Sequence, residues 1–304
     1  MASEQFGLPP AAEGRWELRG PAENIPIVQA WADDYIRYGE RRPAWKRQVR
    51  EAIRTSCRRL EPPARHVLHA TFFGDKPSDA DIENLALYNI DESFTVAGRN
   101  GIRFEHGDPV VPKAPGGAQY PFCYRYEVVP RGSTFRHWQT ARAVASFGWT
   151  DLGAFVDEKR VAQVWLALSR ASVEVSEPLA PETPFAVRVE VRPPHGRPPV
   201  WGGSMKKIFD GVISAFQADI QRPDLPEIVA RLANYLPAVP DEIEEHLLDE
   251  RQAVLGVVTR LVYLRGAGVQ WNPSDHLCVA GELLAAEPAG PSWVIKGEIV
   301  ELSR

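Results

Sequence analysis

The sequence predicts an α+β protein in which an N-terminal helical segment precedes two related strand–helix–strand halves. Three observations indicate this fold class. Apolar residues recur at helical spacing over 45–60 and 205–217. Short apolar or alternating runs, typical of strands, lie at 67–73 and 185–191. A strand, a polar loop, a helix and further strands also follow one another twice along the chain, which predicts an internal duplication.

Composition and charge narrow the functional classes. The chain has 304 residues, of which 44% are hydrophobic and 25% charged, so it can bury a sizeable core. Three widely spaced cysteines argue against a disulfide framework and a structural zinc site. Since the sequence has neither a membrane-length apolar run nor a secretory leader, we expect a cytoplasmic protein with no membrane partner. The net charge of −5 means that any DNA-binding surface must be local. The sequence does not set the oligomeric state.

The N-terminal segment, residues 1–60, is expected to be irregular at first and helical over 24–60. Its second part contains a helix whose apolar stripe includes Trp45, Val49 and Ile53. The other faces of this helix are basic, with Lys46, Arg47, Arg50, Arg54 and Arg58. Such a surface is typical of a solvated helix, and it is also typical of a helix that contacts nucleic-acid phosphates.

The first α/β half, residues 61–176, contains a carboxylate-rich helix start. We expect strands at 67–73, 102–106 and 122–129 and a short helix at 81–90. Asp79, Asp81 and Glu83 lie where the first strand leads into this helix. Carboxylates at such a position suit a hard cation such as Mg²⁺. They are also favoured at helix N-termini because they cap backbone N–H groups and interact with the helix dipole.

The second α/β half, residues 177–304, begins within a segment at 174–184 that is rich in Pro, Glu and Ser and is the best candidate boundary. The order of elements predicted here is a strand at 185–191, a helix at 205–217, a helical insertion near 222–252, and strands at 255–264, 276–284 and 294–300.

Three charged residues of this second half could take part in chemistry. Lys206 and Asp210 lie one helical turn apart, which suits either a surface ion pair or a lysine directed at a scissile phosphate. Asp275 precedes a strand, as a turn residue or as a metal ligand.

Together these segments resemble the motifs of RusA-type Holliday-junction resolvases. In that family a D-x-D-N motif opens a helix that carries a Lys and an Asp, and another Asp follows a Trp-containing turn. Residues 81–84 resemble the first motif with Glu83 in its second acidic place, residues 206–210 resemble the K-x-x-x-D helix, and residues 271–275 resemble the turn. The resemblance implies a Mg²⁺-dependent endonuclease that acts on branched DNA as a dimer, with the tandem duplication in place of that dimer.

Each half departs from the family pattern in a different place. The first half has Leu87 or Tyr88 in the register of the helix lysine, and the second half has Val-Trp-Gly-Gly at 200–203 in place of the acidic motif. Either the halves form one composite site or both sites have been lost. A composite site would use as catalytic residues Asp81, Glu83, Lys206, Asp210 and Asp275. Its metal ligands would be Asp79, Asp81, Glu83 and Asp275.

Two other classes of function remain open from the sequence. The first is a non-catalytic binding or scaffold protein, with a protein partner on the acidic helical segment 225–252. The second is a small-molecule enzyme whose pocket lies between the halves. A short distance between Asp81 and Asp275 would favour the nuclease over both, because shared metal ligands must converge.

Overall fold

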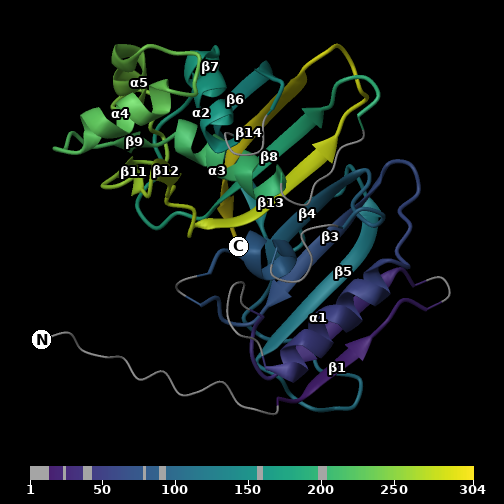
Figure 1. Cartoon of the computed structure of the whole chain (residues 1–304). Coiled ribbons are helices and arrows are strands. Elements are labelled where there is room, and N and C mark those ends of the chain that lie inside the picture. The colour runs from purple at the N-terminus through teal and green to yellow at the C-terminus, as the bar shows by residue number, and fades with distance from the viewer. Residues whose placement is uncertain are drawn as a thin grey trace, which may run out of the picture.

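A ten-stranded mixed sheet forms the centre of the protein, with helices packed against it (Figure 1). The computed structural model describes residues 14–22, 25–36, 43–77, 80–88, 94–155, 160–197 and 204–304. The strands of the large sheet are β1 (Trp16–Arg19), β2 (Ile27–Ala32), β3 (His66–Phe73), β4 (Gly101–His106), β5 (Phe122–Pro130), β6 (Gln139–Gly153), β7 (Val173–Val175), β8 (Phe185–Arg192), β13 (Cys278–Ala285) and β14 (Trp293–Ser303). The α-helices are α1 (Ala44–Cys57), α2 (Arg160–Arg170), α3 (Met205–Ala215), α4 (Leu225–Ala233) and α5 (Pro240–Leu247). A π-helical turn, η1 (Asn84–Tyr88), follows β3.

The strand order in the sheet is β1-β2-β5-β3-β4-β13-β8-β14-β6-β7. Five strands from the N-terminal part of the chain therefore lie on one side of the sheet, and five later strands lie on the other. In the first group, β3 runs parallel to β4 and antiparallel to β5, which pairs with β2. In the second group, β8 runs parallel to β13 and antiparallel to β14, which pairs with β6.

The connections follow the same order in both groups. The chain passes from β2 through α1 to β3, and then through η1 to β4 and β5. In the second group it passes from β6 through α2 to β8, and then through α3 to β13 and β14. Consequently η1 and α3 hold corresponding places, each between two parallel neighbouring strands.

The two groups meet at the antiparallel pair β4–β13, where Ile102 lies opposite Leu283 and Phe104 opposite Gly281. A side chain at position 281 has no room, because a Cβ atom there would lie 2.8 Å from the ring of Phe104. The ring of Phe104 in turn packs edge-on against Phe209 of α3, with 5.5 Å between centroids. Close packing at this junction therefore seats α3 over the centre of the sheet.

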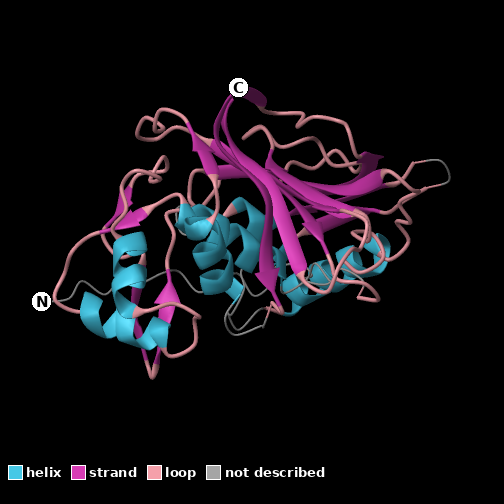
Figure 2. Cartoon of the chain, turned by 90° about the horizontal axis from the view of Figure 1, so that it is seen from above, coloured by secondary structure: helices cyan, strands magenta, loops and turns pink. Residues whose placement is uncertain are grey.

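The helices gather on one face of the sheet, and loops cover much of the other (Figure 2). Alternation along the strands explains this arrangement, because successive side chains of a strand point to opposite faces. In β3, Leu68, Ala70 and Phe72 belong to the large apolar core beneath the helices. The intervening His69 and Thr71 are also buried, but they lie on the face covered by loops.

An insertion between α3 and β13 enlarges the second group. It contains α4, α5 and four short strands: β9 (Ala218–Asp219), β10 (Val257–Val258), β11 (Val262–Arg265) and β12 (Gly268–Trp271). Both helices lie within 222–252, where the sequence favours helical structure. Half-buried Arg222 connects the parts of the insertion, because its guanidinium reaches Asp219, Asp224 and the carbonyl oxygen of Val262.

The α+β class is confirmed, but two expectations about organisation are wrong. The lead-in expected to be irregular contains β1, and the segment 24–60 expected to be helical contains β2 before α1. Ile27–Ala32 is a strand because its β-branched and aromatic residues pair with β5 and bury Val28 and Trp31. The chain also passes from one strand group to the other between β5 and β6, well before residue 176. No helix within the described ranges is long and apolar enough to span a membrane.

Candidate functional site: four carboxylates around Lys206

Helix α3 brings Lys206 and Asp210 to the site. Its apolar residues, including Ile208, Phe209 and Val212, are buried against the sheet. Lys206 and Asp210 lie one turn apart, and Lys206 Nζ lies 3.1 Å from Asp210 Oδ1. The apolar periodicity of α3 thus orients both charged side chains away from the core.

The chain between β3 and η1 brings two more carboxylates. Ile82 and Leu85 are fully buried and anchor this segment, which leaves the side chains of Asp81 and Glu83 beside α3. Asn84 donates from Nδ2 to Asp81 Oδ2 at 2.7 Å, so it helps to orient the aspartate. The segment does not continue as the expected α-helix, because a π-helical turn forms over Asn84–Tyr88.

Asp275 completes the cluster from the turn between β12 and β13. The turn is closed by main-chain hydrogen bonds from Asp275 N to the Pro273 oxygen and from Cys278 N to the Asp275 oxygen, at 3.0 and 2.9 Å. It directs the Asp275 carboxylate toward α3.

Lys206 Nζ is the point on which these groups converge. It lies 3.2 Å from Asp275 Oδ2, 3.4 Å from Asp81 Oδ2 and 4.0 Å from Glu83 Oε2, in addition to its contact with Asp210. We refer to Asp81, Glu83, Lys206, Asp210 and Asp275 as the Lys206 cluster. The structure thus brings together all of the residues named above for a composite catalytic site.

Burial and charge shift the ionisation of the cluster. Burial raises the pKa of Glu83 to about 8 and that of Asp275 to about 7. Burial also raises the pKa of Asp210. For Lys206, burial alone would lower the pKa, but the carboxylates, Asp210 foremost, outweigh it and hold the pKa well above its ordinary value. The lysine is therefore a fixed cation among carboxylates that outnumber it.

The chemistry of the donors suits a hard divalent cation, since carboxylate oxygens are the ligands that Mg²⁺ prefers. An ammonium group already stands at the point of convergence, which indicates that the cluster attracts positive charge. Within the ranges that the structure describes, however, no group of three or more His, Cys, Asp or Glu side chains is arranged to hold a metal ion. Asp79, the fourth expected ligand, lies outside these ranges.

Helix α1 presents only part of its expected basic surface. Arg47 and Arg58 are exposed, and Arg50 and Arg54 are half-buried. Lys46 differs from the expectation, because it is 4% exposed and its Nζ lies 2.5 Å from Asp34 Oδ2. It falls beside the apolar stripe of α1 rather than on the outer face, so an ion pair with the partly exposed Asp34 takes the place of the expected phosphate contact. Glu51 pairs with Arg54 and Arg58, which reduces the positive charge of this face.

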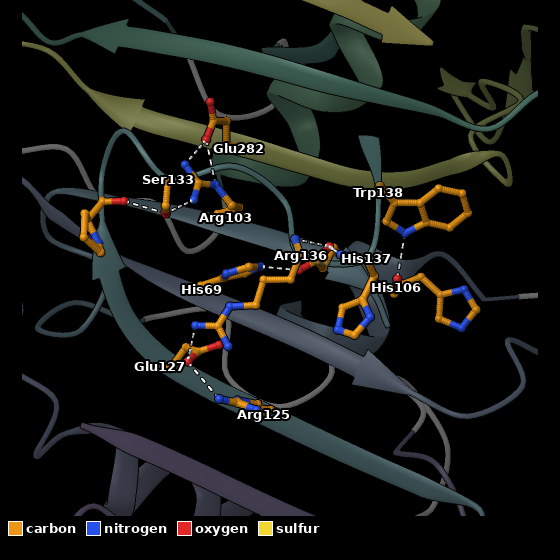
Figure 3. Close-up of polar contacts among 12 residues, drawn as sticks. His69, Arg103, His106, Arg125, Glu127, Ser133, Arg136, His137, Trp138 and Glu282 are labelled. Atoms are coloured by element: carbon orange, nitrogen blue, oxygen red, sulfur yellow. Dashed lines mark hydrogen bonds and ion pairs between the residues drawn. The ribbon is translucent and has the colours of Figure 1, made fainter. Parts of the chain in front are cut away.

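A second polar network lies on the loop-covered face of the sheet (Figure 3). Buried Arg103 donates to Glu282 and Ser133, as Figure 3 shows. It also donates to the main-chain oxygen of Arg131. His69 Nε2 lies 2.9 Å from Glu105 Oε1, and both residues are almost fully buried. Sequence reasoning missed this network, although Val67 and Phe73, the apolar residues that share the face of β3 with His69, indicate that this face is buried.

Comparison with known proteins assigns no family to the chain. No protein-family model matches it. No curated protein matches it either. The arguments for function therefore rest on the residues and their geometry.

Proposed function

We propose that the protein is a metal-dependent endonuclease that acts on branched DNA. The convergence of the Lys206 cluster carries this proposal, because its members come from three distant segments of the chain and each resembles part of one kind of active site. The matching order of connections in the two strand groups further supports a tandem duplication of a RusA-like unit. In this proposal each half supplies the residues that the other lacks.

The carboxylates and the lysine have different roles in the proposed reaction. Asp81, Glu83 and Asp275 would hold Mg²⁺, which would neutralise phosphate charge and lower the pKa of an attacking water. Asn84 keeps Asp81 in place through its hydrogen bond. Lys206 supplies a permanent positive charge to a non-bridging phosphate oxygen, because its pKa lies far above neutrality. Asp210 fixes the lysine side chain along α3.

DNA binding is assigned to the exposed basic residues of α1. Arg47 and Arg58 are the exposed members of this surface, with Arg50 and Arg54 between them. Their contacts would go to phosphates, which sets affinity without reading sequence. Recognition would then depend on the shape of the branch point.

The test is cleavage of four-way-junction, flap, single-stranded and linear duplex DNA by the purified chain with Mg²⁺ or Mn²⁺. We expect metal-dependent incision of branched substrates that is lost in Asp81→Asn and Lys206→Met. Asp241→Asn, an exposed aspartate at the start of α5, is the matched control and keeps activity. Intact substrates in every lane would refute the nuclease. A retained gel shift in that case would leave DNA binding without catalysis.

A further inference from the structure

We propose that Gln217 is a positioning residue that holds the Asp275 turn against α3, which deepens the proposed function of the Lys206 cluster. Gln217 follows the C-terminal end of α3, the helix that carries Lys206 and Asp210. Its side-chain amide bonds twice to the main chain of Ser274: Nε2 donates to the Ser274 oxygen and Ser274 N donates to Oε1, both at 3.1 Å.

The pair of hydrogen bonds resembles the pairing of two peptide groups. A carboxamide can donate and accept at once, whereas a carboxylate can only accept and a thioether does neither well. Two parallel bonds to one residue restrict rotation as well as distance. Since Ser274 directly precedes Asp275, the amide of Gln217 determines the direction in which the Asp275 side chain leaves the turn.

Burial indicates that these hydrogen bonds are needed. Gln217 is 3% exposed between Phe216 and Ala218, which are fully buried. A buried amide is costly unless its donor and acceptor are both satisfied, and Ser274 satisfies both. An apolar side chain would fill the same space, so the amide serves the turn rather than the core.

Apart from the main-chain hydrogen bonds that close it, the turn has little support from packing. Pro273, Ser274 and Asp275 are half-buried and His276 is exposed, so packing does not hold the segment in one place. The side chain of Ser274 bonds within the turn, to His276 Nδ1 at 3.0 Å. One rigid helix thus holds Lys206 at its start and, through Gln217 at its end, the carboxylate that must meet that lysine.

The proposal is tested by the rate at which an amine-acetylating reagent modifies Lys206, read by mass spectrometry. The reagent reaches Lys206 slowly while its Nζ is enclosed by carboxylates, and displacement of Asp275 opens one side of this enclosure. We expect Gln217→Met to raise acetylation of Lys206 several-fold, to the level of Asp275→Asn. The double variant, Gln217→Met with Asp275→Asn, should be acetylated at Lys206 as fast as Asp275→Asn alone, because Gln217 acts through Asp275. Gln217→Glu, which keeps only the acceptor, should fall between the wild type and Gln217→Met.

Two controls separate positioning from loss of structure. Acetylation of Lys296, on β14, should be unchanged in each variant, and circular dichroism should show a folded protein. Ser214→Ala removes a fully buried hydroxyl for which the described structure shows no hydrogen-bond partner, and it should leave Lys206 as in the wild type. Unchanged acetylation in Gln217→Met, or additive effects in the double variant, would overturn the proposal. Because acetylation is independent of catalysis, a failure of DNA cleavage alone would refute the nuclease and not the positioning role.

Discussion

Asp81 and Asp275 share one hydrogen-bond donor, because Lys206 Nζ lies 3.4 Å from an oxygen of the first carboxylate and 3.2 Å from an oxygen of the second. The lysine is separated from them by 125 and 69 residues along the chain. Fixed positions in two different parts of the fold are therefore needed to bring the two carboxylates together. Such an arrangement has measurable consequences for stability and ionisation.

Removing the cation of the cluster should destabilise the protein. Lys206→Met leaves Asp210 and Asp275 without the positive charge that offsets their burial, so we expect a loss on the order of 2 kcal/mol in the free energy of unfolding. Urea unfolding measures it. Lys296→Met is the matched control, because its ion pair with Glu190 is more exposed and should contribute less than about 1 kcal/mol. Equal effects in the two variants would contradict the burial of the cluster.

Ionisation of Glu83 should make stability fall as the pH rises. Its pKa is about 8 in the folded protein against an ordinary value of 4.5, so the folded state retains a proton that the unfolded state releases. The stabilisation is complete below the ordinary pKa and is lost as the pH approaches 8, by up to about 1.4 kcal/mol per pH unit. Urea unfolding between these limits should give a shallower slope for Glu83→Gln than for the wild type. Identical slopes would mean that Glu83 is ionised throughout.

Glu105, on the opposite face, should have the opposite pH dependence. Burial alone would raise its pKa, but His69 and the backbone N–H groups of His137 and Arg136 outweigh this and lower it. Because the pKa of Glu105 is lower in the folded protein, its carboxylate stabilises the fold at pH values above its ordinary pKa. This stabilisation is lost as the pH falls through the pKa of the folded state. Glu105→Gln should therefore lose less stability on acidification than the wild type. Cleavage at neutral pH should be unaffected, because the residue lies away from the Lys206 cluster.

The exposed and buried basic residues of α1 should separate DNA binding from stability. Arg47→Gln and Arg58→Gln should weaken binding to all branched substrates, and each substitution should lower the slope of log Kd against log salt concentration by about one. Lys46→Gln should instead lower the free energy of unfolding by about 1–3 kcal/mol, because its partner Asp34 loses a buried cation. Fluorescence anisotropy and urea unfolding measure the two effects. A binding defect confined to Lys46→Gln would refute the assignment of this surface.

Several elements could be predicted because local pattern and tertiary position agree. Helix α3 has its apolar residues at helical spacing, and apolar and polar residues alternate along β8. Both elements can therefore be predicted from local sequence. Strand β2 and the long strand β6 do not follow from local pattern. The sequence favours helical structure over β2, and β6 is polar along much of its length because one of its faces is exposed. These segments form strands because β2 pairs with β5 and β6 pairs with β14. Local sequence does not specify such pairing between distant segments.

The candidate residues are likewise visible in the sequence, but their assembly is not. Local pattern predicted that Asp81 and Glu83 open a helix, that Lys206 and Asp210 lie one helical turn apart, and that Asp275 precedes a strand as a turn residue or a ligand. Only the tertiary structure decided that the lysine lies among four carboxylates, that Lys46 is buried against Asp34, and that Gln217 supports the Asp275 turn. The physical reason is that hydrogen-bond distances between remote segments depend on the pairing of β4 with β13 and on the close packing of α3 over that junction, which no single segment of the chain specifies.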